Sequence, residues 1–310
     1  MRTPSMLLLL VWAALPCRMP AQPSLAEPFM PELLGQLPPV RDLALSPDGT
    51  EAYFTLQSYQ GESSAILYTR RVRGRWSQPE VAPFSGQYQD LEPSFSPDGR
   101  TLWFASNRPD PRRPDWQGGM DLWYVQRSGA GDAWSAPVNP GPPLNSAADE
   151  FYPAATASGN LYFTAVLPGG PGQDDLYVSY FRDGAFLPPQ LLGDSVNSPG
   201  YEFNAWVSPD ESHLIYTCYG RPDGLGSGDL YLSQRRPDGA WGRVRNLGPE
   251  YNSPQMDYCP SVAGQTLYFT SKRSQVRSRF PQRQTFRSLL EEFSRYENGL
   301  SRIYQAPKPF

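Results

Sequence analysis

The sequence predicts an all-β fold, a five-bladed β-propeller whose blades are four-stranded antiparallel sheets. Three observations support this prediction. The 310 residues include 35 Pro, 27 Gly, 18 Tyr, 15 Phe and 8 Trp, a composition typical of short strands joined by tight turns. One turn motif between two β-rich runs recurs five times along the chain. The repeats begin about 50 to 60 residues apart, a period that accommodates four short strands in each.

The turn motif is clearest at Ser96–Gly99, between the runs Asp90–Phe95 and Thr101–Ala105. Pro97 presets the backbone for a turn and Gly99 accepts a positive φ, so the unit predicts a β-hairpin. Four further copies carry the same motif with varying completeness: Ser46–Gly49, Ala157–Asn160, Ser208–Asp210 and Ala263–Gln265.

A landmark before each hairpin sets the repeat boundaries. In the last three repeats an Asn-Ser pair precedes an acidic residue at a constant spacing, as at Asn145, Ser146 and Glu150. The repeats then begin at Val40, Asp90, Glu150, Glu202 and Asp257. We therefore expect one propeller domain over residues 22–310, with blades 1 to 5 at about 40–84, 85–144, 145–196, 197–251 and 252–310.

Each repeat continues with a third β-rich run, and in four repeats an aromatic residue follows that run. These aromatic residues are expected to pack between neighbouring sheets: Trp76, Trp134, Phe186 and Trp241. Blade 5 lacks a fourth strand before the chain ends. Pro31–Gly35 matches Pro189–Gly193, the fourth strand of blade 3, in pattern. We therefore expect residues 28–35 to close the ring by pairing with the third strand of blade 5, which removes exposed sheet edges.

Blade 5 also carries an insertion between Arg273 and Gly299. Phe286, Leu289, Leu290 and Phe293 share one helical face. With Thr285 as N-cap and Asn298-Gly299 as the end signal, they predict a helix over about 286–297. Five basic residues precede this helix. We expect it to pack at the channel mouth. Its apolar face could simply cover a blade edge or the mouth, or the helix could act as a lid or as a partner-docking element.

The N-terminal segment differs from the rest of the chain. Arg2 precedes the apolar run Met6–Leu15, and Ala21 offers a cleavage point. This pattern predicts a signal peptide over residues 1–21, because the run is too short to span a bilayer. Lipidation of Cys17 is an alternative. The expected location is therefore periplasmic or secreted, and the net charge of −4 does not favour a nucleic-acid partner.

The motifs Ser-Pro-Asp-Gly at 96–99, Leu-Tyr-Phe-Thr at 267–270 and Gly-Asp-Leu-Tyr at 228–231 resemble the WD40-like β-propeller repeats of TolB type in secreted bacterial proteins. The resemblance covers residues 28–310. It implies a propeller that acts as an interaction module. Members of that family are often fused to peptidase or peptidoglycan-binding domains, and no such domain remains here after five blades.

Candidate binding residues converge on the face where the inner strands begin and the long loops lie. They are the acidic residues Asp90, Glu92, Glu150, Glu202 and Asp257, the arginines Arg108, Arg221 and Arg273, and Trp116. Three interpretations stay open. The carboxylates could be structural, they could bind a peptide, a glycan or a cation, or a pair of them could hydrolyse glycosides.

Other sites are disfavoured by the residue inventory. His213 is the only histidine, so a Ser-His-Asp site and a histidine-based zinc site are not expected. No cofactor or metal is expected. Cys218 and Cys259 fall at the same face of adjacent blades, where a disulfide is plausible in an oxidising compartment. The sequence thus favours a non-catalytic binding propeller whose partner is an envelope protein, a peptide or a glycan. The alternative is a glycan-active hydrolase.

Overall fold

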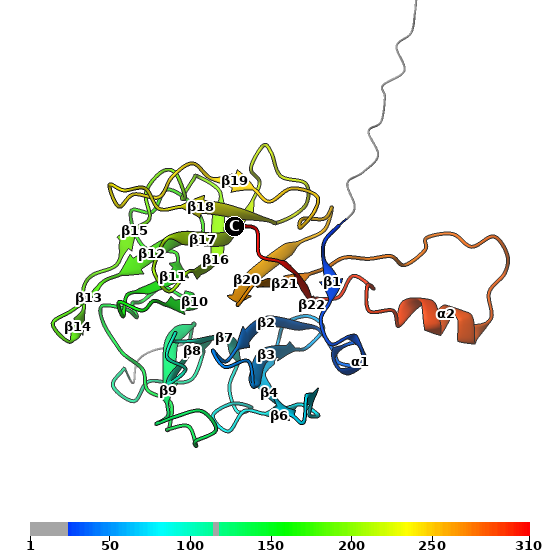
Figure 1. Ribbon diagram of the computed structural model, residues 1–310, viewed down its shortest axis with the longest axis horizontal. Coiled ribbons are helices and arrows are strands. Elements are labelled where there is room, and N and C mark those ends of the chain that lie inside the picture. Colours follow the sequence, from blue (N-terminus) through cyan, green and yellow to red (C-terminus); the bar gives the residue numbers. More distant parts are fainter. Residues whose placement is uncertain (1–23, 114–117) are drawn as a thin grey trace, which may run out of the picture.

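The computed structural model describes residues 24–113 and 118–310, and its strands form the predicted ring of five antiparallel sheets (Figure 1). The predictions for the signal peptide, for Cys17 and for Trp116 concern residues outside these ranges. The inner strands contact one another around the central channel. The fold class predicted from the turn repeats is therefore confirmed.

The strands of each blade are given from the channel outward. Blade 1 contains β2 (Val40–Leu45), β3 (Glu51–Gln57), β4 (Ser64–Val72) and β6 (Glu80–Val81), with β5 (Arg75–Trp76) paired to the end of β4. Blade 2 contains β7 (Asp90–Phe95), β8 (Thr101–Ser106) and β9 (Asp121–Gln126), and its fourth strand is reduced to a bridge between Tyr124 and Val138.

Blades 3 to 5 follow the same plan. Blade 3 contains β10 (Glu150–Ala155), β11 (Leu161–Ala165), β12 (Asp175–Ser179) and β15 (Gln190–Leu191), with a hairpin of β13 (Phe181–Arg182) and β14 (Ala185–Phe186). Blade 4 contains β16 (Tyr201–Val207), β17 (His213–Tyr219), β18 (Asp229–Gln234) and β19 (Arg245–Asn246). Blade 5 contains β20 (Asp257–Ala263), β21 (Thr266–Ser271), β22 (Arg302–Pro307) and β1 (Glu27–Pro28).

The predicted turns form the hairpins between the first and second strands. At Ser96–Gly99 the Ser96 hydroxyl donates to Asp98 Oδ1 at 2.6 Å, and the Arg100 N–H donates to the same oxygen at 3.0 Å. Gly99 has φ 69°, which glycine adopts without steric cost. The hydrogen bond from Ser96 lowers the pKa of Asp98. The opposite end of each blade carries the longer loops, which we call the loop face.

The ring is closed by the N-terminal segment against the third strand of blade 5, as predicted, but the pairing strand begins at Glu27 and includes only the start of the predicted range 28–35. Glu27 pairs with Gln305 and Pro28 with Tyr304. The following residues form a helical turn, α1 (Pro31–Leu34), instead of a strand. Pro31 at the first helical position favours this conformation. Leu34 is fully buried in the cluster between blades 5 and 1.

Apolar clusters between neighbouring blades form the core. One position of the second strand is at most 1% exposed in all five blades: Phe54, Phe104, Phe163, Tyr216 and Phe269. Trp134 and Trp241 pack between neighbouring sheets as predicted. In residues 24–113 and 118–310, no helix is long and apolar enough to cross a membrane.

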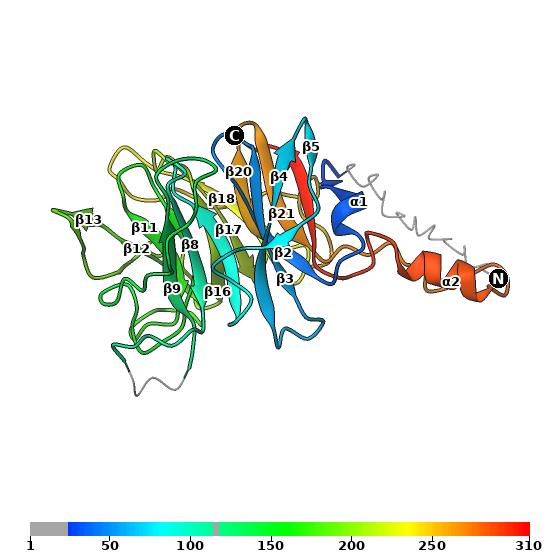
Figure 2. The same ribbon diagram turned by 90° about the horizontal axis from the view of Figure 1, so that it is seen from below.

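The predicted helix in blade 5 exists as α2 (Phe286–Phe293), and Thr285 caps its start in a capping box. It ends four residues earlier than predicted. Its position also differs from the prediction, because α2 lies on a long arm that projects away from the ring instead of covering the channel mouth (Figure 2). Phe286 is 82% exposed and Phe293 54% exposed, so no part of the propeller buries the apolar face.

Candidate functional site

All but one of the carboxylates predicted to form a binding ring are held inside their own blades, the exception being Glu92. Asp90 is fully buried and accepts hydrogen bonds from Ser85 at 2.7 Å and from Ser106 at 2.6 Å. Arg108 completes its ion pair. These partners use the lone pairs of the carboxylate, so Asp90 stabilises the loop face of blade 2.

Blades 4 and 5 repeat this arrangement. Glu202 accepts from Ser198 and lies 3.6 Å from Arg221 Nη2. In blade 5, Asp257 accepts from Ser253 and lies 3.3 Å from Arg273 Nη2. The Asn-Ser landmark thus has a structural meaning. Its Ser donates a hydrogen bond to the acidic residue. The side chain of its Asn bonds the backbone N–H and the carbonyl of a third-strand residue in the preceding blade. The three pairs are Asn145–Leu122, Asn197–Leu176 and Asn252–Leu230.

Glu150 in blade 3 departs from this pattern. Ser146 donates to its Oε1, but Ala165 and Leu167 occupy the positions at which blade 2 has Ser106 and Arg108. Glu150 Oε2 is buried and has no hydrogen-bond partner among the described residues. Burial therefore raises the pKa of Glu150 to about 7.

A different ring of side chains meets at the centre of the channel. One residue of each inner strand, the third in four blades and the fourth in blade 4, has a positive φ between 47° and 61° and lies within a β-bulge. A bulge bends the strand and re-aims a side chain. The five residues are Asp42, Glu92, Tyr152, Asn204 and Cys259, and all are at least nine-tenths buried.

Glu92 is the hub of this ring and is the one predicted acidic residue that lies there. Its Oε1 accepts from Arg41 Nη2 at 2.9 Å and from Asn204 Nδ2 at 3.3 Å, and its Oε2 accepts from the Tyr152 N–H at 2.7 Å. Burial raises the pKa of Glu92 to about 7, although Arg41 opposes this shift. A cavity of about 90 Å³ lies on the hairpin side of Glu92, which is small for any organic ligand.

The predicted disulfide does not form, because the two thiols point to different places. Cys259 lies in the channel ring, 3.4 Å from Asn204 Oδ1. Cys218 lies in the cluster between blades 3 and 4, where its thiol donates to Glu202 Oε1 at 3.1 Å. Both cysteines are free and buried.

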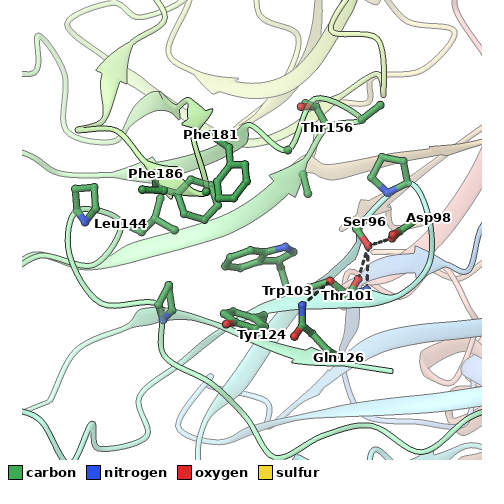
Figure 3. Close-up of a pocket in the computed structure, with 18 of the residues that line it drawn as sticks. Ser96, Asp98, Thr101, Trp103, Tyr124, Gln126, Leu144, Thr156, Phe181 and Phe186 are labelled. Atoms are coloured by element: carbon green, nitrogen blue, oxygen red, sulfur yellow. Dashed lines mark hydrogen bonds between the residues drawn. The ribbon is translucent and has the colours of Figure 1, made fainter. Parts of the chain in front are cut away.

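A cleft of about 930 Å³ lies between blades 2 and 3, a size that suits a small organic ligand. Figure 3 shows Trp103 and Tyr124 of blade 2 on one wall and Phe181 and Phe186 of the blade 3 hairpin on the other. The Trp103 ring lies 4.9 Å from Tyr124 and 6.1 Å from Phe186, measured between ring centroids. We call this hollow the aromatic cleft.

Polar groups surround the aromatic cleft, and they are mostly uncharged. Ser96, Thr101, Gln126 and Thr156 line it, and among the described residues Asp98 is the one acidic residue in its lining. The Asp98 carboxylate is occupied by Ser96 and by the Arg100 N–H. The cleft therefore offers aromatic faces together with hydroxyl and amide groups.

The equivalent spaces between blades 1 and 2 and between blades 3 and 4 are filled. Between blades 1 and 2, Arg127 lies 2.5 Å from Glu51 and its guanidinium stands 4.3 Å from the Trp134 ring centroid. Between blades 3 and 4, Arg235 pairs with Glu211 at 2.5 Å and stands over Trp241. We call the space between two neighbouring blades a wedge. Each set of arginine, carboxylate and tryptophan fills its wedge.

Blade 3 lacks this seal because different residue types occupy the same positions. By strand register, Phe181 stands where the neighbouring blades have Arg127 and Arg235, and Phe186 replaces the tryptophan. Thr101 begins its strand where Glu51 begins the corresponding strand of blade 1. The sequence analysis missed the aromatic cleft. The one signal for it was the replacement of arginine by Phe181 in an otherwise repeated pattern.

Solved structures of other proteins share the fold of this chain, although no sequence family matches it. No family model matches the chain, and no curated protein matches its sequence. Among solved structures, the chain is similar to a GH62 hydrolase in complex with xylotriose (11% identity, 88% of this chain and 92% of that one, TM-score 0.53). It is also similar to the catalytic domain of a Coprinopsis cinerea GH62 alpha-L-arabinofuranosidase (10%, 88% and 91%, TM-score 0.51).

A TolB from Acinetobacter baumannii is also similar, at 14% identity and a TM-score of 0.47. The match covers 87% of this chain, which spans about half (55%) of that protein. At these identities the likenesses concern the fold alone. The class defined by fold and sheets is a five-bladed β-propeller, and the resemblance to TolB-type repeats holds at the level of that architecture.

Proposed function

We propose that the protein is a non-catalytic binding propeller, located in the periplasm or secreted, which takes a neutral saccharide in the aromatic cleft. The unsealed wedge between blades 2 and 3 is the observation that carries this proposal. A sugar ring presents C–H groups that pack on aromatic faces such as Trp103 and Phe186, while its hydroxyls need donors and acceptors such as Thr101 and Gln126. A charged ligand would find no free counter-charge among the lining residues.

The test reseals the cleft. Thr101→Glu combined with Phe181→Arg copies the Glu51–Arg127 pair into the open wedge, so the double variant should fold and lose its ligand. Calorimetry against a panel of neutral trisaccharides of glucose, xylose, mannose or N-acetylglucosamine should show binding that falls about tenfold or more in the double variant. Tyr59→Ala, at a side chain 71% exposed outside the cleft, is the control. The proposal is wrong if no trisaccharide binds, or if the resealed variant binds equally well.

A peptide or an envelope protein, the other partners expected from the sequence, would be recognised by a different result. A pull-down from an envelope fraction that the resealed variant abolishes, without any saccharide binding, would support a protein ligand in the same cleft.

A glycan-active hydrolase is the second candidate. The overall likeness to GH62 hydrolases and the pKa of Glu92 near 7, beside Asp42 in the channel ring, favour it. Against it stand the small cavity and the occupied oxygens of Glu92. Assays on arabinofuranosides and xylosides decide the question. Hydrolysis in the channel would be established if Glu92→Gln abolishes turnover and the double variant of Thr101→Glu with Phe181→Arg leaves it intact.

A further inference from the structure

The insertion of blade 5 forms an arm, residues 274–299, whose helix is turned with its polar side toward the arm itself. Glu292 is 5% exposed and accepts from the Arg277 N–H at 2.8 Å, and Arg295 Nη2 lies 2.9 Å from its other oxygen. A small polar hollow of about 220 Å³ lies between α2 and the segment that precedes it. The buried carboxylate on the polar side of α2 therefore finds its hydrogen-bond and ion-pair partners within the arm.

The opposite face of α2 is apolar and points outward. Phe286, Leu290 and Phe293 are 82%, 53% and 54% exposed, and they lie at i, i+4 and i+7 on one side of the helix. Leaving such side chains in water forgoes the free energy that their burial would provide. The two views show that the arm stands well clear of the ring (Figures 1 and 2). Its tip can therefore reach a surface that the propeller itself does not touch.

The charge of the arm is opposite to that of the rest of the molecule. Residues 274–299 carry five arginines and three glutamates, a formal charge of +2, while the whole chain has −4. Arg277 and Arg295 are paired with Glu292. Arg279, Arg283 and Arg287 are exposed and form no ion pair with the described residues. The arm thus combines an apolar helix face with unpaired arginines, which suits a surface whose interior is apolar and whose outer layer is negatively charged.

We propose that the arm docks the protein on an anionic lipid surface. Phe286, Leu290 and Phe293 would insert at the boundary between headgroups and acyl chains, while the three unpaired arginines contact phosphate groups, which guanidinium recognises by bidentate hydrogen bonds. The base of the arm contacts the start of the described chain, where Arg273 Nη1 donates to Ser24 Oγ at 2.9 Å. This proposal is independent of the aromatic cleft.

The experiment measures flotation with phosphatidylcholine vesicles that contain 30% phosphatidylglycerol, and with vesicles of phosphatidylcholine alone. The purified protein should bind the anionic vesicles and lose binding as salt rises. Each basic side chain near an anionic surface strengthens binding about fivefold, so changing Arg279, Arg283 and Arg287 to Gln should weaken binding about a hundredfold. Changing Phe286, Leu290 and Phe293 to Ser should abolish binding. The matched control changes three exposed apolar residues elsewhere, Tyr59, Val72 and Leu225, to Ser.

The changed side chains are exposed, so each variant should fold like the parent. Thermal melts check this. The proposal is overturned if the parent protein does not bind anionic vesicles, or binds neutral ones equally well. It is also overturned if the control triple variant loses as much binding as the arm variants. A dimer in size-exclusion chromatography that the Phe286, Leu290 and Phe293 changes dissociate would identify a second copy as the occupant and would equally refute lipid docking.

Discussion

At the residue scale, one position in each inner strand decides which polar groups reach the channel. Its left-handed backbone turns Asp42, Glu92, Tyr152, Asn204 and Cys259 inward. In three blades the backbone N–H at this position donates to a threonine of the preceding blade: Glu92 to Thr55, Asn204 to Thr164 and Asp42 to Thr270. Blade 2 has Ala105 at the threonine position, and Glu92 accepts the Tyr152 N–H instead. The Glu92 carboxylate thus takes the place of the threonine hydroxyl that blade 2 lacks.

Glu150 provides a pH prediction. Its folded pKa of about 7 lies above the ordinary value of 4.5, so the unfolded chain releases its proton first as the pH rises. Stability is therefore unaffected below about pH 4.5, falls between 4.5 and 7, and stays reduced above. Glu150→Gln should be more stable than the parent by about 1–3 kcal/mol at pH 8 and nearly equal to it at pH 4.5.

Urea unfolding at both pH values checks this prediction. Glu202→Gln is the matched control, because it removes a carboxylate that has an arginine partner and should destabilise the protein at pH 8. A Glu150→Gln variant that is less stable than the parent at pH 8 would show that the carboxylate is satisfied.

Cys218 and Cys259 provide a second prediction. Burial raises the pKa of the Cys218 thiol to about 12, and Cys259 is buried in the channel ring, so both should stay protonated and unreactive in the folded protein. Thiol titration should find both only after denaturation, and a reducing agent should not change the melting temperature. A protein without titratable thiols in denaturant would instead contain the bridge expected from the sequence.

At the element scale, ring closure depends on a short strand followed by a helical turn. Only Glu27 and Pro28 pair with the free edge of β22, and the chain then turns into blade 1. Met30 has φ 48° and makes this change of direction. The similarity of Pro31–Gly35 to the fourth strand of blade 3 was therefore misleading. The same residues form a strand or a helical turn according to the edge that remains open.

The packing of α1 can be tested with neighbouring leucines. Leu34 is fully buried between blades 5 and 1, so Leu34→Ala should destabilise the protein by about 2–4 kcal/mol. Leu33→Ala, at a partly exposed side chain, should cost clearly less. Thermal melts or urea titrations measure both. Equal effects of the two substitutions would mean that α1 does not contribute to closing the ring.

At the scale of the whole molecule, the propeller and the arm should be separable. The buried residue of α2 is Glu292, whose partners lie within the arm, whereas Tyr296 packs in the core and donates to the Ile303 carbonyl at 2.6 Å. Replacing residues 276–294 by a short Gly-Ser link should therefore leave the melting temperature within a few degrees of the parent. Loss of cooperative melting in the shortened protein would make the arm part of the folding unit.

The sequence alone determined the number of blades, the hairpins and the capped helix, because these depend on local spacing: Ser96–Gly99 and its copies each form a turn from their own residues, and Thr285 caps α2 within one helical turn. The tertiary structure decided what each side chain faces. It placed Asp90 in an ion pair with Arg108, turned Cys259 away from Cys218 and directed α2 outward. It also left the wedge beside Phe181 open. These outcomes depend on which neighbouring blade or surface satisfies a polar group or buries an apolar one, and the partners are distant in the sequence.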